Sequence, residues 1–354
     1  MSARIPVSLK SGPYEVVVGN GILTLAGHEI ASVTKPCRCA LISDSVVAPL
    51  YAPQVESSLR EAGFDPVRIT VPSGEASKSL STVESVCDAM IAAGLDRSSM
   101  VVALGGGVIG DLAGFVASIY YRGIPCIHIP TTIVAQVDSS IGGKTGVNAS
   151  GGKNLMGSFH QPRLVLSDPE TLRTLPPREF NEGFAEVVKH AAIRDPEMLD
   201  LIGPDRDLES LVTRNANIKA AIVMGDEFET KGLRAFLNFG HTIGHGIEAA
   251  AGYGRLLHGE AISLGIAAAC FLSREHAGFS EPEAMRILNA LASFDLPLSL
   301  PADIPNHSIV ESMSKDKKFS AGAIRFILLR SLGDPFVSSE ITVADLDLAI
   351  ESIR

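Results

Sequence analysis

The chain has 354 residues, of which 46% are hydrophobic and 20% are charged, and its formal net charge is −10. This length suits about two domains, and the composition excludes a largely disordered chain. The acidic balance argues against a surface for nucleic acid or for an anionic membrane, so we expect neither as a partner.

The cysteine pattern and the apolar segments predict a cytoplasmic protein. Five cysteines without C-x-x-C spacing are typical of reduced core thiols and make a thiolate zinc site improbable. The N-terminal run MSARIPVSLK has no apolar signal core. Glycines and Asp111 interrupt the most apolar stretch, residues 100–121, so we expect no membrane span.

In the first half of the chain, short β-rich runs alternate with helical patterns. The expected strands are 14–18, 39–43, 67–71, 100–104 and 126–129, and helices are expected at 46–62 and 82–93. Strands and helices in this alternation predict βαβ units on a parallel sheet.

The second half changes character at a cluster of turn formers, residues 168–177. Alanine-rich amphipathic segments then dominate, at 182–193, 208–224, 235–251 and 260–276. We therefore expect an α/β domain over residues 1–172, with a parallel sheet, and a mainly α-helical domain over residues 173–354.

A glycine-rich turn follows the expected strand 100–104. Gly105, Gly106 and Gly107 lead into a helical segment that contains Gly110. Glycines let backbone N–H groups approach a pyrophosphate, and a helix N-terminus favours its charge. Asp44 ends the strand 39–43, where an acid can bind a ribose hydroxyl, and a polar loop spans 74–79. These features together favour a dinucleotide site, although a simple tight turn would also explain the glycines, and the late position excludes a standard Rossmann domain.

Histidines cluster in the second half. His241 and His245 are four residues apart, so a helix would place them on one face, and His258 follows closely. Glu186 lies on an earlier helical segment. Histidine and carboxylate ligands without cysteine suit a catalytic divalent ion. Three of nine histidines within eighteen residues favour this interpretation over hydrogen-bonded core histidines.

Several cations could bind an anionic ligand. Lys144 and Lys153 lie in segments that we interpret as glycine-rich loops, and neither loop matches the ATP-binding motif. Scattered lysines are more often solvated surface residues. Arg234 and Asn238 are four residues apart, and a helix would place them on one face, close to that of His241.

Longer motifs resemble those of the 3-dehydroquinate synthases, within the sugar-phosphate cyclases. The resemblance covers nearly the whole chain in the family's order. The matching runs are LGGGVIGDLAGFVA (104–117), RG (122–123), PTT (130–132), QVDSSIGGKT (136–145), GKNL (152–155), LPPRE (175–179), AEVVK (185–189), GLR (232–234), NFGHTIGH (238–245), HGE (258–260) and DKK (316–318).

The resemblance implies NAD in the α/β domain, a zinc or cobalt ion, and a homodimer. It implies that 3-deoxy-D-arabino-heptulosonate 7-phosphate, an anionic seven-carbon sugar phosphate, is converted to 3-dehydroquinate and phosphate in the shikimate pathway, with transient oxidation by NAD. The alternatives are a valiolone-type or scyllo-inosose-type cyclase, a metal-dependent polyol dehydrogenase, and a catalytically inactive binding protein.

The resemblance also implies roles for individual residues. Glu186, His241 and His258 would ligate the metal, and His245 would be an acid/base residue. The residues expected around NAD are Asp44, Glu75, Lys78, Gly106, Gly107, Val108, Asp111, Thr131, Thr132, Lys153, Thr171 and Thr174. Those expected to contact substrate are Arg122, Asp138, Lys144, Asn154, Lys189, Lys219, Arg234, Asn238 and one of Lys317 and Lys318.

The chain departs from the family pattern at three places. One additional residue between Asp226 and the GLR motif leaves the placement of Glu229, a further catalytic candidate, open. Glu182 stands where a small or amide residue is common, and Gly151 replaces a leucine.

Overall fold

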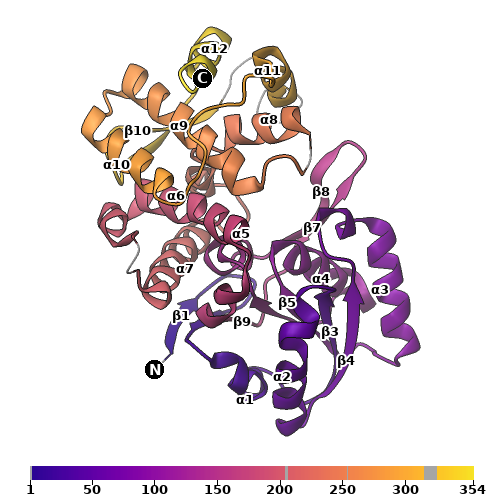
Figure 1. Ribbon diagram of the computed structural model, residues 1–354. Helices are drawn as coiled ribbons and strands as arrows, with labels where there is room; N and C mark the ends of the chain where they lie inside the picture. Colours follow the sequence, from indigo (N-terminus) through magenta and orange to yellow (C-terminus); the bar gives the residue numbers. More distant parts are fainter. Residues whose placement is uncertain (1, 204–205, 253, 315–324) are drawn as a thin grey trace. The chain divides into compact units, whose positions relative to one another are not determined.

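The computed structural model describes residues 2–203, 206–252, 254–314 and 325–354 (Figure 1). It divides into two compact units. Unit 1 comprises Met1–Leu175 and Leu208–Phe228, and unit 2 comprises Pro176–Asp207 and Glu229–Arg354. In the part of the chain that the structure describes, no helix is both long enough and apolar enough to cross a membrane.

Unit 1 contains a seven-stranded sheet, counted over the described residues, with the strand order β1-β2-β9-β6-β5-β3-β4. Its strands are β1 Ala3–Val7, β2 Tyr14–Val18, β3 Arg38–Asp44, β4 Asp65–Val71, β5 Met100–Gly105, β6 Cys126–Pro130 and β9 Leu164–Ser167. The edge strand β1 pairs antiparallel with β2, and the other neighbours are parallel. The predicted parallel sheet is therefore confirmed.

Both faces of this sheet are covered by helices, because successive side chains of the central strands are apolar. In β3, Cys39 and Leu41 pack with α1 Ala26–Ala31 and α2 Val47–Glu61. Ala40 and Ile42 pack on the other face with α3 Leu80–Ala92 and α4 Gly107–Ile119. A strand buried on both faces reads as a continuous apolar run, which is typical of parallel sheets.

The chain reverses its winding between β3 and β5, which are adjacent in the sheet. From β3 the chain passes through α2 to β4 at the sheet edge, and from β5 it passes through α4 to β6 on the other side. The two connecting helices lie on opposite faces. Ligands of open α/β sheets bind at the carboxyl ends of strands at such a point.

Helix α7, Leu208–Gly225, belongs to unit 1. It contacts β1, β2, the π-helical turn η4 Ala135–Ser139 and the 3₁₀ turn η5 Pro169–Thr174. The expected division at residues 172 and 173 assigned this segment to the helical domain, and its contacts correct that assignment. The remaining short 3₁₀ turns of unit 1 are η1 Ile22–Leu25, η2 Glu75–Ser77 and η3 Tyr120–Arg122.

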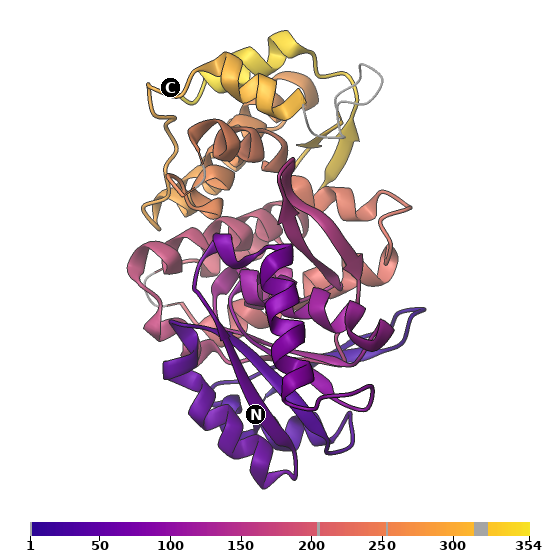
Figure 2. The ribbon, with the colours of Figure 1, turned by 90° about the vertical axis from the view of Figure 1, so that its right-hand side faces the viewer.

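Residues 144–159 form an antiparallel hairpin, β7 Lys144–Ala149 and β8 Gly152–Phe159, which is separate from the main sheet (Figure 2). The interpretation of Lys144 and Lys153 as loop residues is therefore wrong. Glycine suits these strands because their backbones approach so closely that a Cβ at Gly157 would lie 2.2 Å from the Thr145 carbonyl oxygen.

Unit 2 is mainly helical, as predicted (Figure 1). Its apolar core joins side chains of α8, α9, α11, α12 and β10, among them Ile243, Leu264, Ile309, Phe326 and Leu346. Its described elements are α5 Pro177–Glu182, α6 Phe184–Arg194, η6 Pro196–Leu201, η7 Leu233–Asn238, α8 His241–Ala251, α9 His258–Ala277, α10 Glu281–Ala292, α11 Asn306–Ser314, β10 Phe326–Leu329, β11 Pro335–Ser338 and α12 Val343–Glu351.

The expected helix 235–251 is broken. Gly240, with a φ of 77°, lies between η7, which ends at Asn238, and α8, which begins at His241. A Cβ at this position would lie 2.5 Å from Cγ1 of Ile266 in α9, so the close packing of α8 against α9 requires glycine. The break separates Arg234 and Asn238 from the helix that carries His241.

Candidate functional site

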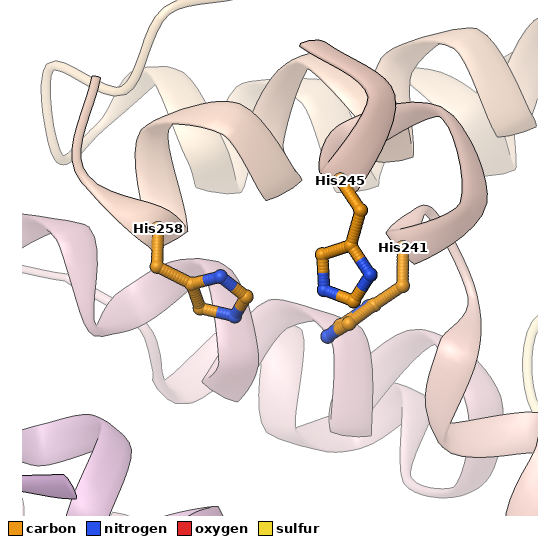
Figure 3. Close-up of side chains that lie close together, drawn as sticks. All are labelled: His241, His245 and His258. Carbon is orange, nitrogen blue, oxygen red and sulfur yellow. The ribbon is translucent and has the colours of Figure 1, made fainter. Parts of the chain in front are cut away.

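Three histidines converge in unit 2 (Figure 3). His241 and His245 lie one turn apart on α8, and His258 is the first residue of α9. Their ring centroids are 5.2 Å apart for His241 and His245, 5.6 Å for His241 and His258, and 5.7 Å for His245 and His258. One ring nitrogen from each lies within 4.8 Å of the others, close enough to share a metal ion.

Glu186, on α6, brings a carboxylate to the same place. Its side chain is fully buried, and its Oε1 lies 3.2 Å from Nε2 of His241 and 3.4 Å from Nε2 of His258. Lys189, one turn further along α6, pairs with its Oε2. A buried carboxylate with two imidazole nitrogens is a ligand set that suits zinc or cobalt.

The outer ring nitrogens of two histidines face acceptors. Nδ1 of His241 lies 3.2 Å from the carbonyl oxygen of Phe239, and Nδ1 of His258 lies 3.3 Å from Oε2 of Glu248. With Nδ1 donating to these acceptors, Nε2 of each ring is the nitrogen that would bind a cation beside Glu186. Ligating histidines are oriented in this way by their second nitrogen, so the residues present fit a divalent ion.

The charges around Glu186 favour a cation. Burial opposes ionisation of Glu186, but Lys189 and His241 hold the pKa of its carboxyl well below the usual range. Burial also lowers the pKa of His258, yet hydrogen bonds to Glu186 and Glu248 outweigh this and raise that pKa to about 10. Burial lowers the pKa of His241. A carboxylate that stays charged in the interior must be matched by positive charge.

The other predicted residues of unit 2 are dispersed along its elements. Arg234 is buried and Asn238 half-buried, both on η7, and Glu229 is exposed with a φ of 59°. The expectation that Arg234 and Asn238 share a helical face is wrong, because a 3₁₀ helix has three residues per turn and places positions four apart about 120° from one another. Lys317 and Lys318 lie outside the described residues.

A second constellation lies in unit 1, where β5 ends and α4 begins. A Cβ at Gly106 would lie 2.9 Å from Cγ2 of Thr132, and one at Gly107 would lie 3.1 Å from Oγ of Ser139. Over the described residues, no side chain caps α4, so its first N–H groups remain available. This uncapped helix, at the point where the sheet reverses its winding, fits the pyrophosphate of a dinucleotide.

Acidic and basic residues surround this turn. Asp44 ends β3, and its Oδ1 accepts hydrogen bonds from the N–H groups of Val46 and Val47 at 2.8 and 3.0 Å. Lys78 is buried and pairs with Asp111 of α4, whose pKa is raised by burial. The other predicted cofactor residues in unit 1 come from five places: Glu75 begins η2, Val108 lies in α4, Thr131 and Thr132 follow β6, Lys153 lies in β8, and Thr171 and Thr174 lie in η5.

The predicted substrate residues of unit 1 come from five elements, η3, η4, β7, β8 and α7. Asp138 on η4 pairs with Lys219 on α7, which explains why both belong to unit 1. Arg122 and Asn154 have φ values of 71° and 56°, which are unfavourable for residues other than glycine and often mark functional positions. Lys144 is exposed at the start of β7.

Sequence reasoning missed several supporting residues. Glu248 lies seven residues after His241 on α8, a spacing that indicates a shared helical face but not its contact with His258. The amide nitrogen of buried Gln136 donates to the carbonyl oxygens of Pro130 and Asp168 and to Oγ1 of Thr171, at 2.9–3.1 Å. No spacing rule indicates Gln136. Glu182, which departs from the family pattern, accepts a hydrogen bond of 2.6 Å from the Gly259 N–H in the first turn of α9.

The fold is shared with synthases and dehydrogenases of known structure. A 2-deoxy-scyllo-inosose synthase complexed with carbaglucose-6-phosphate, NAD⁺ and Co²⁺ is 26% identical, with a TM-score of 0.88 over 99% of this chain and 100% of the other. The 2-epi-5-epi-valiolone synthase of Streptomyces hygroscopicus, with NAD⁺ and Zn²⁺ bound, is 29% identical, with a TM-score of 0.87 over 98% of each chain. A glycerol dehydrogenase of Schizosaccharomyces pombe, at 15% identity and a TM-score of 0.64 over 96% of this chain and 88% of the other, shares the fold alone.

Sequence comparison then defines the family. The 3-dehydroquinate synthase N-terminal model matches residues 68–182, and the C-terminal model matches residues 183–319. The 3-dehydroquinate synthase of Symbiobacterium thermophilum is 44% identical over 96% of this chain and 98% of its own length. That of Pelobacter propionicus is 45% identical over 93% and 94%. The chain belongs to the 3-dehydroquinate synthase family.

Proposed function

We propose that this protein is a 3-dehydroquinate synthase. It converts 3-deoxy-D-arabino-heptulosonate 7-phosphate to 3-dehydroquinate and phosphate in the shikimate pathway, which leads to aromatic amino acids. The observation that carries this proposal is the convergence of His241 and His258 on the buried Glu186 carboxylate, in a chain whose relatives of that name match it over nearly their whole length.

The protein uses NAD and a divalent ion, zinc or cobalt. Support comes from two related synthase structures, which contain NAD⁺ with Co²⁺ or with Zn²⁺. When bound, NAD accepts a hydride from the substrate and returns it, and the ion polarises the substrate hydroxyl that is oxidised. Glu186, His241 and His258 hold the ion. The residues assigned to NAD are Asp44, Glu75, Lys78, Gly106, Gly107, Val108, Asp111, Thr131, Thr132, Lys153, Thr171 and Thr174.

His245 carries protons to and from the substrate. Its ring lies one helical turn from His241 and 5.2 Å from that ring, which is near enough to serve a substrate held by the same ion. A neutral imidazole accepts a proton at one nitrogen and an imidazolium returns it, so a histidine suits a reaction that includes oxidation, elimination and reduction.

Cations recognise the phosphate and the carboxylate of the substrate. Charge-assisted hydrogen bonds from such cations orient an anionic substrate and stabilise the departing phosphate. The residues assigned to the substrate are Arg122, Asp138, Lys144, Asn154, Lys189, Lys219, Arg234, Asn238 and one of Lys317 and Lys318, with Glu229 as a further candidate.

The competing assignments differ in substrate and in stoichiometry. A valiolone-type or scyllo-inosose-type cyclase acts on a substrate without a carboxylate, and a polyol dehydrogenase releases one NADH for each turnover. The identities of 44% and 45% to 3-dehydroquinate synthases, against 26% and 29% to the two other synthases, favour the first assignment. A catalytically inactive binding protein would not need this full set of ionisable groups.

We propose that the enzyme is a homodimer and resides in the cytoplasm. Its cysteines are free, which suits a reducing compartment.

The dimer is supported by exposed apolar side chains in unit 1. Phe159 and Phe228 contact each other edge to face although 42% and 48% of their surfaces are exposed, and Leu155 is 57% exposed. Exposed apolar side chains that gather in this way are typical of subunit interfaces. Light scattering after size-exclusion chromatography measures the molar mass.

The activity is tested by incubating the protein with the seven-carbon phosphate and a catalytic amount of NAD. We expect many molecules of phosphate to be released for each NAD. Removal of metal by chelation should abolish release, and added zinc or cobalt should restore it. Full activity in metal-free protein, or NADH formed in stoichiometric amounts, would contradict the proposal.

A further inference from the structure

Asn148 occupies an irregular position in the hairpin of β7 and β8. Val147 pairs with Met156, but Ala149 pairs with Gly152, so β8 contains two more residues than β7 between these pairs. Asn154 lies in this bulge with a φ of 56°. Bulges redirect side chains and are frequent beside active sites.

The side chain of Asn148 makes two different contacts. Its Nδ2 donates to Oε1 of Glu75 at 2.8 Å, and its Oδ1 accepts from the backbone N–H of Asn154 at 3.0 Å. A carboxylate can only accept and an N–H can only donate, so these two partners determine the orientation of the amide. Aspartate could satisfy only the second, and an aliphatic side chain neither.

The backbone of Asn148 adds a third link. Its N–H donates to the carbonyl oxygen of Lys78 at 2.9 Å. Residues 75–78 are thus joined to the hairpin by one residue through both its backbone and its side chain. The bulge leaves the Asn154 N–H without its regular strand partner, and the Asn148 oxygen replaces that partner.

We propose that Asn148 is a positioning residue that couples the cofactor side of the reaction to the substrate side. It holds the Glu75 carboxylate for the cofactor and holds Asn154 in its left-handed conformation for the substrate. This inference rests on the proposed function, which assigns Glu75 to NAD and Asn154 to the sugar phosphate.

The two contacts can be separated by mutation. Asn148→Asp retains the oxygen that faces Asn154 but places a second carboxylate against Glu75. We expect NAD to bind about tenfold more weakly, the effect of a lost hydrogen bond to a charged group, while KM for the substrate at saturating NAD changes less than about twofold. Asn148→Ala loses both contacts and should weaken NAD binding and raise KM for the substrate.

A second substitution at the partner tests the contact itself. In the double variant Glu75→Gln/Asn148→Asp, an amide again faces a carboxylate with the roles exchanged. The effect of Asn148→Asp on NAD affinity should therefore disappear in the Glu75→Gln background, because the two positions are coupled. Asn217→Asp, on an exposed position of α7 where the amide donates to the Thr213 carbonyl of the same helix, is the matched control and should behave as the unchanged protein.

NAD affinity is measured by calorimetry on the full-length, metal-loaded protein, and KM by phosphate release. Unchanged NAD affinity in both Asn148 variants overturns the inference, as does an equal rise of KM in both. A lower melting temperature or kcat with unchanged affinity and KM would mean a purely structural role and would also overturn it. Failure of the unchanged protein to bind NAD would instead refute the proposed function.

Discussion

The contact between Glu248 and His258 predicts how strongly the protein holds its metal. Oε2 of Glu248 lies 3.3 Å from Nδ1 of His258, and the Glu248 side chain is 9% exposed. The carboxylate fixes the ring and makes its other nitrogen a more basic ligand. We therefore expect substitutions at Glu248 to weaken zinc binding without removing a ligand.

The size of the effect follows from the geometry. Loss of such a supporting partner costs about ten- to a hundredfold in metal affinity. Glu248→Gln retains an oxygen near Nδ1, and the contact of 3.3 Å is longer than a short charge-assisted bond, so we expect about tenfold, or about 1.4 kcal/mol. Glu248→Ala removes the acceptor and should approach a hundredfold, or about 2.7 kcal/mol.

The assay is competition for zinc with a chromophoric chelator, followed by turnover at saturating zinc. Glu275→Gln is the matched control, since it removes the same charge from an exposed position on α9, the helix that begins with His258. Both Glu248 variants should regain much of their activity when zinc is in excess. Zinc affinity equal to that of Glu275→Gln in both variants would refute the role of Glu248 as a support for His258.

Three further predictions concern other residues. His241→Ala should lose metal, whereas His245→Ala should keep metal and lose rate; metal analysis and kinetics on both variants check this, and the reverse pattern would exchange the two roles. Burial lowers the pKa of His128 to about 4, so stability is complete above the unfolded pKa of about 6.5 and falls as pH drops toward 4. From pH 7.5 to pH 5 the unfolding free energy of the unchanged protein should fall by about 2 kcal/mol relative to His128→Asn, as measured by denaturant titration, and a constant difference would exclude a neutral buried imidazole. Arg234→Lys should raise the activation free energy for the carboxylate-bearing substrate by about 2 to 3 kcal/mol, measured as a lower kcat/KM with unchanged metal content, because lysine cannot form a bidentate pair. An equal loss on a neutral sugar phosphate would mean that Arg234 is structural.

The sequence by itself determined the class of fold and most of its regular elements. The strands expected at 39–43 and 100–104 are confirmed within β3 and β5, because a strand buried on both faces must be apolar at every position. The helix expected at 260–276 is confirmed within α9. Long motifs indicated the family, because the order of residues along the chain can be matched without knowing which residues are in contact.

Only the tertiary structure decided which elements pack together and how the chain bends between them. Helix α7 packs with unit 1, although its sequence resembles the helices of unit 2. Gly240 interrupts an amphipathic pattern that reads as one helix, because α9 passes too close for a side chain. Lys144 and Lys153, expected in glycine-rich loops, lie in the two strands of a hairpin.

The candidate sites show the same division. The four-residue spacing of His241 and His245 correctly predicted that they lie on one face of a helix, since four residues make about one helical turn. It could not reveal that Glu248 faces His258 or that Asn148 faces Glu75, ten and seventy-three residues away in the sequence. Periodicity records which face of an element is buried, whereas the partner across that face is set by long-range packing, which no local pattern contains.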